Sequence, residues 1–179
     1  MSASLEFKLV IVESGKEIAS KVLSYEDVSS IISALQDNES NQKIFEAGAI
    51  HSASSVREQV ASKDNLSESA VKVLVQDKAI NVLRNLVRSQ KFKETADQKT
   101  LEELIDRDPE VAQSIAGDLD SFSEADQNAL AQKLASHVDL TVLNALAGSY
   151  NTPKKILKTL SGHSDPYIAS QAKEQLDNS

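Results

Sequence analysis

Two histidine–aspartate pairs recur toward the C-terminal end of the sequence. His137 is followed two residues later by Asp139, and His163 by Asp165. Imidazole nitrogens and carboxylate oxygens both bind zinc, and equivalent positions of neighbouring repeats would bring the two histidines close together. Since no third and fourth ligands stand at suitable spacing, we interpret both histidines as polar loop residues that recur with a repeat.

A cluster of four basic residues lies in the middle of the chain, with no acidic residue inside it. Its members are Arg84, Arg88, Lys91 and Lys93. Arg84 and Arg88 are four positions apart, so a helix would place them on one face. Such a cluster can bind a phosphate, a nucleic acid or an acidic segment of a partner, or it can be a solvated face paired with nearby acids.

Other patterns do not reach the level of a catalytic signature. Glu102-Glu103 with Asp106 and Asp108 looks like a carboxylate cluster, but an acidic helix face with a capping residue accounts for these positions. No serine stands in a nucleophile-elbow pattern, and there is no glycine-rich phosphate loop. The chain has no cysteine, which excludes thiolate metal sites and iron–sulfur clusters. We therefore expect no enzymatic activity, no cofactor and no bound metal.

The composition favours an aliphatic helical core. Hydrophobic residues make up 40% of the chain and aromatic residues only 4%, and 5 Gly and 3 Pro are few for an all-β fold. The net charge of −8 opposes binding to nucleic acid or to an anionic membrane. With no secretory signal and no long apolar run recognised, we expect a cytoplasmic protein.

The first segment of the sequence has the pattern of a β-hairpin. Leu5, Phe7, Leu9 and Ile11 alternate along the chain, which is typical of a strand with one buried face. Ser14-Gly15 supplies a turn before a second short strand. An isolated hairpin is only marginally stable in water. We expect it to pack on the helices and cap the core, or to pair with another chain through its edges.

Helical spacing begins after this hairpin. Ser24 is a candidate N-cap with Asp27 three residues later, and four apolar residues then follow at helical intervals: Val28, Ile31, Ile32 and Leu35. A second, weaker helix with Ile44 and Phe45 ends near Gly48.

From about residue 51 the sequence repeats, and repeats decide the architecture. An anchoring β-branched residue recurs at intervals of 26, 29, 31 and 26 residues, at Val56, Val82, Val111, Val142 and Ile168. Each repeat has the pattern of two short helices. Three proline pairs, Asp108-Pro109, Thr152-Pro153 and Asp165-Pro166, place a capping residue before a proline at the first helical position.

These repeats resemble the leucine-rich repeat variant, an all-helical family similar in style to HEAT repeats. The resemblance covers residues 51–176 and is carried by Asn151–Leu160, Asp165–Ala169, Val56–Ala61 and Leu66–Glu68. The Arg that follows the anchor Val in this family is present here as Arg57. The resemblance implies a helical fold and a protein-binding habit.

The expected fold is mainly α, a short right-handed α-solenoid of about five repeats. We expect a β-hairpin over residues 1–24, a helical N-terminal cap over 25–50 and a repeat array over 51–179. The leading functional hypothesis is a non-enzymatic scaffold that binds a protein partner through one face of the array, with a homodimer through the hairpin as a further candidate. A nucleic-acid- or phosphate-binding protein using the basic cluster, and an enzyme built on helical repeats, remain alternatives.

Overall fold

The computed structural model describes residues 5–178, except the side chains of Glu124 and Ala125. The chain is mainly helical and carries one antiparallel hairpin, which confirms the predicted fold class at that level. It divides into two compact units between Lys91 and Phe92. This division falls inside the region where the sequence predicts a continuous array.

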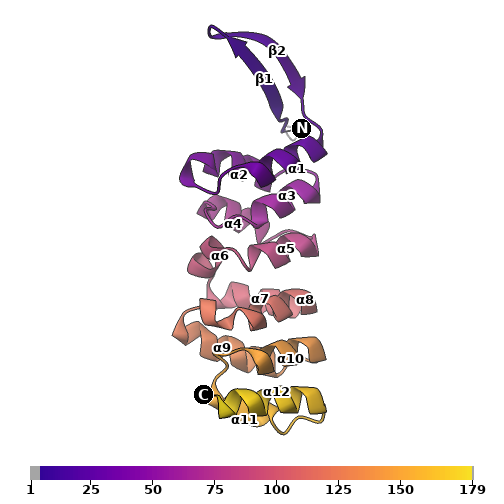
Figure 1. Cartoon of the computed structure of the whole chain (residues 1–179), viewed down its shortest axis with the longest axis vertical. Coiled ribbons are helices and arrows are strands. Elements are labelled where there is room, and N and C mark those ends of the chain that lie inside the picture. Colours follow the sequence, from indigo (N-terminus) through magenta and orange to yellow (C-terminus); the bar gives the residue numbers. More distant parts are fainter. Residues whose placement is uncertain (1–4, 179) are drawn as a thin grey trace. The chain divides into compact units, whose positions relative to one another are not determined.

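The first unit contains the hairpin, built from β1 (Lys8–Glu13) and β2 (Lys16–Val22), and two layers of short helices. In one layer α3 packs against both α1 and α5, and in the other α2 packs against α4 (Figure 1). The helices are α1 (Tyr25–Ala34), α2 (Gln42–Ala49), α3 (Ser54–Ala61), α4 (Glu68–Leu74) and α5 (Ile80–Leu86), with a 3-10 turn at Glu39–Asn41. Helix α6 (Gln90–Thr95) spans the division between the units.

The second unit repeats this layered arrangement. Helix α10 packs against α8 and α12 in one layer, and α9 packs against α7 and α11 in the other (Figure 1). The helices are α7 (Gln98–Arg107), α8 (Pro109–Gly117), α9 (Glu124–Ala135), α10 (Leu140–Gly148), α11 (Lys154–Leu160) and α12 (Pro166–Asp177), with a 3-10 turn at Leu119–Ser121.

The predicted anchor residues all belong to the core, which confirms that they are buried. Each lies on a helix of its own, and none is more than 1% exposed: Val56, Val82, Val111, Val142 and Ile168. The small residues near the ends of four of these helices are also buried: Ala61, Ala116, Ala147 and Ala172. The β-branched and small side chains therefore let adjacent helices of one layer approach closely.

Polar side chains connect residues about one repeat apart within each unit. In the first unit the Asp64 carboxylate accepts a hydrogen bond from the backbone amide of Gln90 at 2.8 Å. Asn85 Nδ2 donates to the backbone carbonyl of Glu58 at 3.2 Å. In the second, Lys133 Nζ lies 2.6 Å from Asp106 Oδ2. The residues that these contacts join are 26 or 27 positions apart, which is close to the anchor interval.

The predicted caps are mostly confirmed. Ser24 and Asp27 form a reciprocal capping box at α1, and Asp108 and Asp165 accept from backbone amides at the starts of α8 and α12. Thr152 is different, because its hydroxyl donates to the Leu146 carbonyl at 2.6 Å and the residue is only 4% exposed. Thr152 thus satisfies a backbone carbonyl in the last turn of α10 instead of capping α11.

One expectation about the N-terminal region is wrong, and one helical position departs from its apolar pattern. Ile31 has the spacing of a core residue, yet it is 41% exposed, while Val28 and Ile32 on the same helix are buried. The hairpin does not cap the helical core, since every residue of β1 and β2 is exposed. Alternation along a strand indicates one buried face only if some element covers that face.

Candidate interaction surface

The hairpin is closed by a tight turn with left-handed backbone. Ser14 has φ of 50° and Gly15 has φ of 79°, the combination that two-residue hairpin turns favour. The register pairs Lys8 with Val22 and Ile11 with Ala19, after which Val12 pairs with Glu17. Ile18 is therefore the extra residue of a β-bulge in β2.

Large apolar side chains cover both faces of this hairpin. Six of them are between 43% and 59% exposed: Leu9, Val10, Ile11, Val12, Ile18 and Val22. Fully burying one such side chain stabilises by about 1.5–3 kcal/mol, so this surface keeps a strong tendency to be covered. Contiguous apolar surface on a folded protein marks an interaction site. We call these six residues the hairpin surface.

The base of the hairpin is fixed to the helical part of its unit. The ring of Phe7 lies 5.9 Å from the ring of His51, the residue that follows the end of α2 by two positions. Lys21 Nζ lies 3.6 Å from Asp27 Oδ2 at the start of α1. Hydrogen bonds from the Ser24 backbone and hydroxyl, and then the charge of Lys21, lower the pKa of Asp27. These contacts hold the hairpin at its root and leave its strands uncovered.

The two edges of the hairpin differ in charge and regularity. Strand β1 carries Lys8 at its start and Glu13 at its end, with four apolar residues between them. Strand β2 carries Lys16, Glu17 and Lys21 and contains the bulge. Charges and bulges are the features by which proteins protect exposed strand edges from pairing, so β2 is the protected edge.

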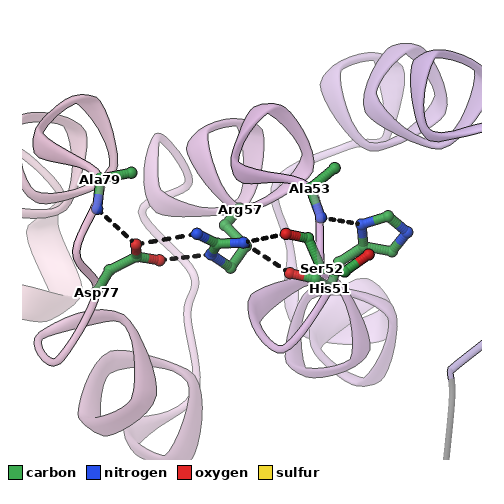
Figure 2. Close-up of polar contacts among 6 residues, drawn as sticks. All are labelled: His51, Ser52, Ala53, Arg57, Asp77 and Ala79. Carbon is green, nitrogen blue, oxygen red and sulfur yellow. Dashed lines mark hydrogen bonds and ion pairs between the residues drawn. The ribbon is translucent and has the colours of Figure 1, made fainter.

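Arg57 and Asp77 form an internal ion pair (Figure 2). The sequence singles out Arg57 but not its partner Asp77. Arg57 Nε lies 2.5 Å from Asp77 Oδ2, and Nη2 donates to Oδ1 at 3.0 Å. Nη1 of the same guanidinium donates to the carbonyls of His51 and Ser52 at 2.8 and 2.9 Å. One side chain thus joins the loop before α3 to the loop before α5.

The environment of this pair keeps both groups charged. Burial alone would raise the pKa of Asp77, but the hydrogen bonds from Arg57 and from the Ala79 amide outweigh burial and lower that pKa. The hydrogen bond with Asp77 raises the pKa of Arg57. Because every oxygen and nitrogen described here is engaged within the protein, the pair is a structural tie between the two loops.

The histidines of the repeats have a structural role in their loops. The Nδ1 atom of His137 accepts from the Asp139 amide at 3.0 Å, and that of His163 accepts from the Asp165 amide at the same distance. His51 does the same for the Ala53 amide at 3.1 Å. These contacts use one of the two ring nitrogens, Nδ1, to order the loop backbone. Across residues 5–178 no cluster of three or more metal-binding side chains occurs.

The basic cluster is distributed over several environments. Arg84 lies on α5, while Arg88 lines an open cavity of about 320 Å³ together with Ser62, Asp64, Asn85 and Ser89. Lys91 is half-buried. Lys93 is only 10% exposed, and its Nζ lies 3.1 Å from Asp118 Oδ2. One of the four predicted binding residues is therefore engaged with an acid of its own unit.

Each acidic residue around Glu102 contacts a different partner, so they do not act together as one cluster. Asp106 pairs with Lys133, and Glu103 Oε1 lies 3.6 Å from Lys99 Nζ. Glu102 accepts from the Gln98 side chain at 2.7 Å, and Asp108 caps α8. This arrangement agrees with the interpretation of an acidic helix face with a cap.

A second, smaller set of exposed apolar residues lies at or just before the starts of two helices of the second unit. Val138 and Leu140 precede and open α10 and are 95% and 50% exposed, and Tyr167 near the start of α12 is 61% exposed. Since α10 packs on α12, this part of the helical layer presents apolar side chains to solvent.

Comparison with known proteins leaves the family open. No family model, no curated protein and no solved structure matches the chain. In the part of the chain that is described, no helix combines the length and apolar character that crossing a bilayer requires.

Proposed function

We propose that this protein is a non-enzymatic scaffold that binds other polypeptides through its N-terminal hairpin and the adjoining helical repeats. The observation that carries the proposal is the hairpin surface, six apolar side chains half-exposed on strands whose root is fixed to the helical unit. A water-facing surface of this kind is most stable when a partner covers it.

The proposed architecture of the helical part is a short right-handed α-solenoid related to leucine-rich repeat variant and HEAT repeats. Buried anchors that recur every 26 to 31 residues and polar contacts between residues 26 or 27 positions apart support this proposal. Such arrays present long faces for protein binding. The exposed Val138, Leu140 and Tyr167 are the apolar residues that we assign to that face in the second unit.

The two alternatives have less support. Binding of nucleic acid would rely on the basic cluster, but the chain has a net charge of −8 and Lys93 is paired with Asp118. An enzyme would need convergent polar groups with a task to perform, whereas the histidines and carboxylates named above are engaged in loops, caps and ion pairs. A cytoplasmic scaffold is the simpler proposal.

The test compares capture by three forms of the tagged chain from its native cells. The hairpin variant carries Leu9→Lys and Ile11→Lys, and the matched control carries Ile50→Lys and Val73→Lys, which replace similarly exposed residues of the same unit. We expect a near-stoichiometric polypeptide with the wild type and the control, reduced at least tenfold with the hairpin variant. Equal capture by all three forms would contradict the assignment of the hairpin surface.

A further inference from the structure

The two edges of the hairpin can be assigned from its hydrogen bonding. The Leu23 amide donates to the Phe7 carbonyl at 2.8 Å, so these residues form a hydrogen-bonded pair of the ladder. Bonded and non-bonded pairs alternate in an antiparallel ladder. With Lys8 opposite Val22 and Val10 opposite Ser20, the amide and carbonyl of Val10 point away from β2, and those of Ser20 point away from β1.

Strand β1 matches a second copy of itself in antiparallel orientation. Its charges lie only at its ends, with Lys8 at the start and Glu13 at the finish. Antiparallel pairing brings the positive end of one strand beside the negative end of the other, while parallel pairing would bring like charges together. The four residues between these ends are all apolar, so the middle of the edge pairs apolar residues with apolar residues.

We propose that two copies of this chain associate through β1, forming a four-stranded antiparallel sheet with the strand order β2-β1-β1-β2. This inference names a partner for the hairpin surface and therefore rests on the proposed function. A twofold axis perpendicular to the sheet passes through the pair of Val10 residues, whose outward amides and carbonyls bond to each other. Leu9 of each copy then lies opposite Ile11 of the other.

The pairing removes the weakness of the isolated hairpin. Two strands alone are marginally stable in water, while three or more strands with an apolar face can be independently stable. In the dimer Leu9 and Ile11 of both copies form one continuous apolar row on one face. Only the β2 edges stay open, and these carry the bulge and the charges Lys16, Glu17 and Lys21.

Proline substitutions at the outward-facing positions of β1 and β2 test which of the two edges forms the dimer. Val10→Pro removes the amide that bonds across the dimer, while the bonds between β1 and β2 use other amides. Ser20→Pro does the same on the β2 edge and is the matched control. In sedimentation velocity at tens of micromolar, we expect wild type and Ser20→Pro at twice the 19.4 kDa chain mass, and Val10→Pro at the mass of one chain.

The absence of cysteine allows a second test that does not depend on proline. Two Val10 residues at the axis would have Cα atoms about 5.5 Å apart, within the range of a disulfide. Under mild oxidation we expect Val10→Cys to form covalent dimers at least tenfold faster than Lys8→Cys, whose two copies lie four residues apart along the strands, and than Ser20→Cys.

Three results would overturn the inference: a wild-type chain that sediments as a monomer, a dimer that Val10→Pro leaves intact, or cross-linking that is no faster at Val10 than at Ser20. The broader function is judged separately. A monomer whose hairpin variant still loses a different captured polypeptide would reject self-association and keep the scaffold proposal.

Discussion

At the residue scale, the polar side chains of this protein are mainly used to define loops. Arg57, Asp77 and the loop histidines each satisfy backbone groups at the points where the chain turns into the next helix. The sequence marks some of these residues by repetition, as with His137 and His163. It does not reveal which acid Arg57 pairs with, because the partner is 20 positions away and only the packing of helices brings it close.

The ion pair of Arg57 and Asp77 makes a prediction about stability and pH. Asp77→Asn should lower the free energy of unfolding near neutral pH by about 1.5–3 kcal/mol, the value of a hydrogen bond to a charged group. The pKa of Asp77 is lowered below its ordinary value of 3.8, so the stabilisation is present above that pH and is lost as pH falls through the folded-state pKa.

Denaturant titrations between pH 7 and pH 2.5 check this expectation. The difference between wild type and Asp77→Asn should stay constant down to about pH 4 and close below it. Asp165→Asn is the control, since asparagine caps a helix as well as aspartate does. A difference that widens toward acid would contradict the assigned direction of the pKa shift.

At the element scale, close packing in the first unit depends on one glycine. A Cβ on Gly48 of α2 would lie 2.7 Å from Ile32 Cδ1 and 2.7 Å from Val60 Cγ2, and both neighbours are buried. We expect Gly48→Ala to lower the free energy of unfolding by about 1–2 kcal/mol because overpacking outweighs the gain in helix propensity.

Gly117 supplies the comparison for this prediction. It ends α8, and a Cβ there would meet no atom within 4 Å, so Gly117→Ala should leave stability unchanged or raise it by up to about 1 kcal/mol. Thermal and urea unfolding of both variants give the answer. A Gly48→Ala chain at least as stable as wild type would show that α1 and α3 pack less closely against α2 than described.

The helices and the hairpin were predictable from the sequence to different degrees. Anchor spacing identified buried residues of the helices, because a β-branched residue that recurs within a helical pattern marks the face that packs against the next helix. The exposure of Ile31 and of both strands was not predictable, since a pattern records which residues are apolar but not what covers them. Thr152 was misassigned because a hydroxyl before proline can cap a helix or bond to the preceding one.

At the scale of the whole molecule, the chain combines acidic charge with an apolar hairpin. A net charge of −8 keeps copies of the protein apart at long range, while the hairpin surface favours association at short range. Self-association through this surface should therefore strengthen as salt screens the repulsion. The sequence alone shows the net charge and the strand pattern. Only the structure shows that the strands are exposed, and therefore that charge repulsion opposes apolar association.

The most direct test of the hairpin as the interaction element is photo-cross-linking in native cells with a benzophenone amino acid at Ile11, compared with the same probe at Val73 of α4, which is similarly exposed. We expect a discrete adduct from Ile11, either with a second copy of the chain or with one recurrent polypeptide, and no discrete adduct from Val73. No adduct at Ile11 in cells where the protein is present would contradict the claim that the hairpin is the interaction element.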